Sequence, residues 1–104
     1  MSLYLIITTV DSEEKGREIA RKLVEERIAV CVSVSKFSFT SFYHWEGKLE
    51  EAQEWILFIK APDYDKVEKR LKELHPYSVP EIIGLKAERV FEAYLNWAIE
   101  ETGQ

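Results

Sequence analysis

Residues 29–59 read AVCVSVSKFSFTSFYHWEGKLEEAQEWILFI, and this segment sets the architecture of the chain. It is rich in β-branched and aromatic residues, many of them alternating, which is typical of extended strands. Glu46-Gly47 lies near its middle and is a pair that favours a tight hairpin turn. The segment therefore predicts one long β-hairpin. Phe42 is out of step with its aromatic neighbours, and a bulge near Thr40-Ser41 is one explanation.

The predicted hairpin is too long for a small domain. At about 3.3 Å per residue, arms of about 15 residues extend about 50 Å, whereas typical strands have about five or six residues. A single subunit would leave the aromatic residues near the tip exposed, namely Phe37, Phe39, Phe42, Tyr43 and Trp45. Because large exposed apolar patches usually mark interfaces, we expect a homo-oligomer in which the hairpin packs on a neighbouring subunit or pairs with its sheet edge.

The segments on either side of the hairpin repeat one pattern of strand, helix and strand. Residues 3–10 predict a buried strand, followed by a helix with an apolar face over residues 19–28 and a cap at Asp11 or Ser12, with Glu14 completing a capping box. After the hairpin, residues 62–63 open a second helix that ends at residues 75–76, and a strand at residues 82–85 precedes a helix over about 88–101. This order predicts an α+β, ferredoxin-like βαββαβ sandwich with a C-terminal helix.

Length and composition limit the class of protein. The 104 residues, 46% hydrophobic and 32% charged, fit a single globular domain spanning residues 1–104. A net charge of −5 argues against nucleic acid and anionic membranes as partners. Cys31 is the single cysteine, so no intrachain disulfide is possible. The apolar run at the N-terminus breaks at Thr8-Thr9, too early for a signal peptide or a membrane span, and we expect a cytoplasmic protein.

Few residues offer catalytic chemistry. The chain has no GxSxG, P-loop, GxGxxG or HExxH motif, and residues 8–12 lack the arginine that an acylphosphatase would need. We therefore predict that the protein is not an enzyme. Glu50, Glu51 and Glu54 follow the hairpin turn and are interpreted as a solvated acidic face.

Three residues are candidate metal ligands by their type. Cys31 is either a small buried hydrophobic residue or a soft ligand for Cu(I) or Zn. His75 either interacts with the dipole at a helix C-terminus or serves as a metal ligand in a cleft. His44 is interpreted as a surface residue, although in a symmetric oligomer one histidine per subunit would suffice for a multi-histidine site.

Four blocks of sequence then point to a family. They are IAVCVSV (residues 28–34), SFYHWEGKL (41–49), HPYSVPEII (75–83) and YLNW (94–97). In this order and spacing they resemble the CutA family of divalent-cation tolerance proteins, and the resemblance extends from about residue 3 to residue 101. It implies a subunit similar to the PII nitrogen regulators, a tight homotrimer whose hairpins wrap neighbouring subunits, and no established enzymatic reaction.

The resemblance also implies binding of copper or another divalent cation, with no organic cofactor. Cys31 matches a cysteine common on the second strand, and His75 matches the histidine of the HPY block. Thr8, Arg70 and Leu74 stand where some relatives carry further ligands, so the remaining donors favour a harder, weaker Cu2+ site at His75 with carboxylates.

Two functions follow from the resemblance. The first is a trimeric protein of the response to metal ions. The second is a PII-like signalling or small-ligand-binding module with a cleft between subunits. Residues recurrent in the family are expected to line that cleft, namely Trp45, Lys60, His75, Tyr77 and Tyr94.

Overall fold

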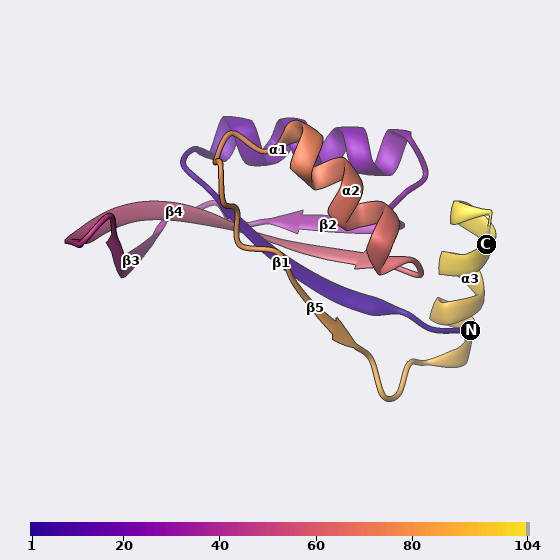
Figure 1. The fold of residues 1–104 in the computed structure, drawn as a ribbon. Helices are drawn as coiled ribbons and strands as arrows, with labels where there is room; N and C mark the ends of the chain where they lie inside the picture. Colours follow the sequence, from indigo (N-terminus) through magenta and orange to yellow (C-terminus); the bar gives the residue numbers. More distant parts are fainter. Residues whose placement is uncertain (104) are drawn as a thin grey trace.

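A computed structural model describes residues 1–103 as one sheet with two helices on one face and a third helix at its end (Figure 1). The elements are β1 (Tyr4–Val10), α1 (Glu13–Glu25), β2 (Cys31–Val34), β3 (Phe39–Trp45), β4 (Lys48–Ala61), α2 (Tyr64–Leu74), β5 (Ile83–Lys86) and α3 (Glu92–Thr102). The strand order is β2-β4-β1-β5, with β3 paired to β4 and every pair antiparallel. The predicted α+β fold, its βαββαβ order and its C-terminal helix are confirmed.

The core lies between the sheet and the helices α1 and α2. Alternate residues of β1 and β4 point to this side, and they are buried with the apolar faces of both helices. The fully enclosed side chains include Ile6, Leu57 and Ile59 from the strands and Leu23 and Leu71 from the helices. This packing on one face fixes the register of the sheet, because a slip of one residue would expose the whole apolar set.

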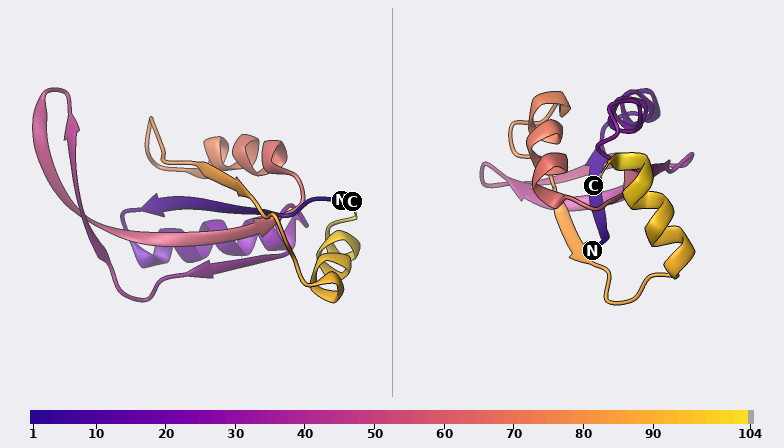
Figure 2. Two further views of the ribbon diagram at one scale, coloured as in Figure 1. Left: turned by 90° about the horizontal axis from the view of Figure 1, so that it is seen from below. Right: turned by 90° about the vertical axis from the view of Figure 1, so that its right-hand side faces the viewer.

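The other face of the sheet has no helix over it (Figure 2). Phe58, Ile83 and Leu85 alternate with core-facing residues and are 40%, 49% and 53% exposed. At one end of the sheet, α3 forms a separate small cluster in which Ala98 packs with Leu3. A single subunit therefore leaves an apolar sheet face open to solvent.

The first helix is shorter than predicted. Ser12 is its N-cap, and the Ser12 hydroxyl accepts a hydrogen bond from the Lys15 amide, so Glu14 does not complete a capping box. The helix ends at Glu25, before Arg27 adopts a left-handed φ of +59°. The Ile28 amide then donates to the Leu23 carbonyl, a local helix-ending hydrogen bond that the apolar periodicity does not reveal.

The second helix agrees with its predicted ends, since Asp63 is the N-cap and His75 the C-cap. The third helix begins later than predicted, at Glu92 instead of near residue 88. The N-cap is Phe91, whose φ of −56° and ψ of 125° lie outside the helical region, so the helix cannot begin earlier. The last strand is shifted by one residue and covers Ile83–Lys86.

The hairpin bends at a different place from the predicted bulge. Its turn is confirmed, because Glu46 and Gly47 have φ of 51° and 79°, as a type I′ turn requires. From Phe39 to Trp45 the pairing of β3 with β4 is continuous, so the bulge predicted near Thr40-Ser41 is wrong. The extra residues lie instead in the segment 35–38, between the ladders of β2 and β3 with β4.

Ser35 explains this interruption. Its amide donates to the Ile56 carbonyl at 3.0 Å, but the Ile56 amide donates to the Ser35 hydroxyl at 2.9 Å instead of to a main-chain oxygen. A side chain thus takes the place of a carbonyl, and the chain leaves the ladder. Beyond this point the hairpin extends past the core and gives the subunit dimensions of 45 × 26 × 24 Å (Figures 1 and 2).

Candidate functional site

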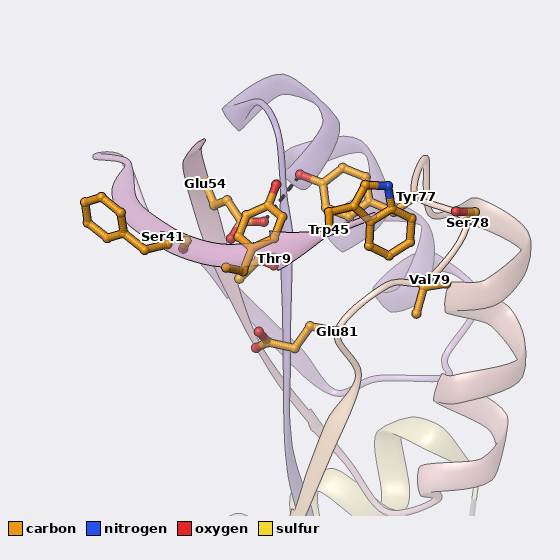
Figure 3. Close-up of a pocket in the computed structure, with 10 residues that line it drawn as sticks. Thr9, Ser41, Trp45, Glu54, Tyr77, Ser78, Val79 and Glu81 are labelled. Atoms are coloured by element: carbon orange, nitrogen blue, oxygen red, sulfur yellow. Dashed lines mark hydrogen bonds between the residues drawn. The ribbon is translucent and has the colours of Figure 1, made fainter. Parts of the chain in front are cut away.

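A cavity of about 650 Å³ lies between the hairpin and the loop that joins α2 to β5 (Figure 3). Tyr43 and Trp45 of β3 line it together with Glu54 of β4. Tyr77 and Glu81 of the loop complete its wall. This volume is within the range of small-molecule sites in proteins.

The pairing of β3 with β4 places the hairpin residues on one side. Phe39 lies opposite Glu54, and alternate residues of a strand share a face, so Tyr43 and Trp45 project to the same side as Glu54. The turn at residues 46–47 sets this register. One tight turn therefore places two aromatic rings on the same face of the hairpin as a carboxylate.

His75 positions the loop. Its side chain is buried, with 8% exposed, and its Nε2 lies 2.8 Å from the Thr9 carbonyl oxygen. The Tyr77 amide donates to Nδ1 at 3.1 Å, and the Tyr77 ring meets the imidazole edge-on at 4.8 Å. Because a carbonyl oxygen only accepts and an amide only donates, the imidazole is neutral and carries its proton on Nε2. His75 thus ties the end of β1 to the start of the loop.

The pKa of His75 agrees with this neutral state. Burial lowers the pKa of the imidazole, and this outweighs the Thr9 carbonyl and the Asp11 and Glu54 carboxylates, which raise it. Burial also raises the pKa of the Tyr77 phenol, with Glu54 as the next cause. Both groups are therefore uncharged at neutral pH.

Two carboxylates face the cavity. The Tyr77 hydroxyl donates to Glu54 Oε2 at 3.4 Å, and the Glu81 side chain extends from the loop into the space below (Figure 3). Partial burial raises the pKa of Glu81, and the charge of Glu54 raises it further. The residues that line the cavity include no Lys or Arg. The cavity is acidic and has aromatic walls.

The predicted cleft residues fall into two groups within one subunit. Trp45 and Tyr77 line the cavity, and His75 lies beside it. Lys60 and Tyr94 lie elsewhere, beside Cys31. The structure therefore does not bring the five residues together in a single subunit.

The second group occupies the open face of the sheet. Lys60 Nζ donates to the Ser33 hydroxyl at 2.8 Å and lies 3.8 Å from Cys31 Sγ. Lys60 lies opposite Leu5 in the pairing of β4 with β1, whereas the His75 side chain is hydrogen-bonded to the carbonyl of Thr9, four residues farther along β1. At about 3.3 Å per residue, about 13 Å of β1 separates the two positions.

The candidate metal ligands do not form a ready metal site. Within residues 1–103, no group of three or more His, Cys, Asp or Glu side chains is placed to hold a metal ion. Both nitrogens of His75 are engaged in hydrogen bonds, and the Cys31 sulfur faces the Lys60 ammonium. His44 is exposed on the hairpin, as interpreted from the sequence. A metal ion would need donors beyond those that one subunit brings together.

Comparison with known proteins identifies the family. A model of the family described as CutA1 divalent ion tolerance protein matches residues 4–101. The chain belongs to the CutA family. The divalent-cation tolerance protein CutA of Thermus thermophilus is 44% identical over 101 residues, which cover 95% of this chain and 97% of that protein. The resemblance inferred from the sequence is confirmed.

Solved CutA structures have the same fold. The structure of CutA from Xylella fastidiosa superposes with a TM-score of 0.93 at 36% identity, covering 98% of this chain and 99% of the other. CutA1 from Pyrococcus horikoshii gives a TM-score of 0.90 at 36% identity, covering 97% and 99%. The family is described by ion tolerance and not by a reaction. None of the helices within residues 1–103 of this CutA family chain is long and apolar enough to cross a membrane.

The sequence did not indicate that Glu54 and Glu81, the two acidic residues of the cavity, belong to the site. Glu54 was interpreted as part of a solvated acidic face, but it is only partly exposed and lines the cavity. Its alternation with Ile56 and Phe58 on β4 was a signal that it shares their strand face. Glu81 lies within the block HPYSVPEII that carried the family resemblance, yet its partner across the cavity is 27 residues away in the sequence.

Proposed function

We propose that this CutA family protein takes part in the tolerance of divalent cations, with Cu2+ among them, and that it works as a homotrimer in the cytoplasm. The observation that carries the proposal is the family match over residues 4–101, with relatives that are named for divalent-cation tolerance. The unpaired Cys31 suits a reducing compartment.

The open sheet face supports the oligomer. Phe58, Ile83 and Leu85 are exposed there, and Phe37 and Phe42 are 84% and 65% exposed on the hairpin. Apolar surface of this extent is unfavourable in water, and burial between identical subunits with closed symmetry removes it. The number of three subunits is taken from the family resemblance.

Metal binding at His75 would require a local rearrangement. The Nδ1 atom of His75 accepts a hydrogen bond from the Tyr77 amide, so a cation that binds at Nδ1 has to displace this hydrogen bond. We expect the loop after α2 to move when His75 binds a divalent cation, with carboxylates as the other donors. Cys31 lies in the other group of residues and would act in a separate site or between subunits.

Copper titration calorimetry on the intact oligomer tests the metal proposal. The wild-type protein is compared with His75→Ala and Cys31→Ser, and His44→Ala serves as the control because His44 is exposed on the hairpin. Micromolar or tighter binding that His75→Ala abolishes and His44→Ala preserves would support His75 as a ligand. Weak binding that is equal in all four proteins would contradict direct binding at these residues. Light scattering in the same samples reports whether the mass is that of a trimer.

A second candidate function is a PII-like signalling or small-ligand-binding module. The cavity favours it, because it has the volume and the aromatic walls of a small-molecule site. In this proposal, Lys60 and Tyr94 of one subunit approach Trp45 and Tyr77 of another and form a cleft between subunits. A thermal-shift screen with nucleotides and metabolites that moves the melting temperature would support it, and a screen without any shift would contradict it.

A further inference from the structure

We propose that the cavity between the hairpin and the α2–β5 loop binds a small organic cation, an amine or quaternary ammonium group carried on an apolar frame. This inference rests on the second proposed function, for which it names the ligand class, and it does not require a metal ion at His75 or Cys31.

The charge of the cavity supports a cationic ligand. Glu54 and Glu81 both face it, and neither forms an ion pair with any Lys, Arg or His in the described part of the chain. The one polar contact of their carboxylates among residues 1–103 is that of the Tyr77 hydroxyl with Glu54. Two acidic groups in one cavity repel each other, and a cation between them removes that repulsion.

The walls determine which kind of cation fits. Tyr43, Trp45 and Tyr77 add aromatic rings to the cavity that the two carboxylates line. The face of such a ring attracts ammonium groups, and aromatic cages are a known solution for binding quaternary ammonium ligands. The same rings offer an apolar surface for the carbon frame of the ligand.

A divalent metal ion fits these walls less well. Mg2+ and Ca2+ take about six to eight oxygen ligands, whereas aromatic carbon supplies none. Apart from the two carboxylates, the side chains that line the cavity of about 650 Å³ supply only neutral hydroxyl oxygens, so most of the coordination shell would remain water. An organic cation uses the carboxylates, the rings and the volume together.

A lysine of a neighbouring subunit is the competing occupant. Lys60 is the cation that the family resemblance assigns to the cleft, but in its own subunit it already donates to the Ser33 hydroxyl and to the Phe58 carbonyl. Moving it into the cavity would break both contacts. A free small molecule requires no such loss.

An NMR titration of the intact oligomer at pH 7.5 with benzylamine, benzyl alcohol and benzoate tests the inference. These probes share one ring and differ in charge. We expect benzylamine to bind with a dissociation constant of about 1 mM or tighter, at least about tenfold more tightly than benzyl alcohol, and benzoate not to bind.

Three variants localise the binding. Glu81→Gln is expected to weaken benzylamine binding about tenfold, and Trp45→Ala about threefold to thirtyfold, since both remove an attraction for the cation. Glu51→Gln is the matched control, because Glu51 lies on the same strand as Glu54 but outside the cavity. Circular dichroism and light scattering establish that each variant keeps the fold and mass of the wild-type protein.

Several results would overturn the inference. One is equal affinity of the wild-type protein for benzylamine and benzyl alcohol, and another is an equal loss of benzylamine affinity in Glu81→Gln and Glu51→Gln. A third uses a further variant, Lys60→Gln: if benzylamine binds to this variant but not to the wild-type protein, a lysine fills the cavity. If other small molecules shift the melting temperature while benzylamine does not bind, the ligand class is wrong but the small-ligand function stands. If no small molecule shifts the melting temperature while copper still binds, the organic-cation inference and the small-ligand function both fail, and the metal proposal stands.

Discussion

His75 holds the end of β1 and the start of the cavity loop together, so replacing it is expected to loosen both. His75→Ala removes the donor to the Thr9 carbonyl and the acceptor of the Tyr77 amide. Each hydrogen bond contributes about 0.5–1.5 kcal/mol, and the lost imidazole leaves a void in a buried position. We expect the free energy of unfolding to fall by about 2–4 kcal/mol.

The assay is guanidinium denaturation at one fixed protein concentration, because dissociation of subunits contributes to unfolding of an oligomer. His44→Ala is the control, since an exposed histidine on the hairpin should change the free energy by less than about 0.5 kcal/mol. His75→Gln retains a donor and an acceptor and should lose less than His75→Ala. If His75→Ala costs no more than His44→Ala, the assigned role of His75 is refuted.

The pH dependence of stability gives a second measure of the same residue. The folded-state pKa of His75 lies below its unfolded value of about 6.5, because burial disfavours the imidazolium. As the pH falls below about 6.5 the unfolded chain takes up a proton before the folded one does, so stability is full above this pH and declines below it. The decline is at most about 1.4 kcal/mol per pH unit. His75→Gln lacks this group, and a difference between it and the wild-type protein that is constant from pH 8 to pH 5 would contradict the argument.

Three further substitutions test the fold and the assembly. Gly84→Ala places a methyl group against the Tyr64 ring and should lower the free energy of unfolding by about 1–3 kcal/mol in thermal denaturation, whereas an unchanged melting temperature would contradict this packing. Phe58→Asp puts a charge on the open sheet face and should shift the mass in light scattering to that of a single subunit; an intact oligomer would exclude this face as the interface. Arg70→Ala breaks the surface ion pair in which Arg70 Nε lies 2.8 Å from Glu26 Oε1, and it should leave the melting temperature nearly unchanged; a clear drop would mean that the pair is shielded from solvent.

Local patterns in the sequence were sufficient for most of the fold. The alternation of apolar residues fixes strands, the helical periodicity fixes α1 and α2, and both depend on neighbours within a few residues. The turn at Glu46-Gly47 and the start of the second helix at residues 62–63 were predicted correctly, because turns and caps are set by the residues that form them. The interruption after β2 was placed wrongly, because it depends on the hydroxyl of Ser35 bonding to Ile56 across the hairpin.

The candidate site likewise has a part that local sequence indicates and a part that depends on long-range pairing of strands. Sequence blocks pointed to His75 and Tyr77, whose contact spans two residues and is therefore local. They did not indicate that Lys60 and Tyr94 lie in a different place from Trp45, because that separation depends on which strands pair and in which register.

The sequence by itself determined the elements, their order and the family, because each is encoded in short-range spacing of residue types. Only the tertiary structure decided the character of the cavity. Glu54 and Glu81 are acidic residues on separate parts of the chain, and they line one cavity only after β4 takes its register and His75 fixes the loop. Long-range contacts of this kind depend on the packing of the whole subunit, and no local pattern carries them.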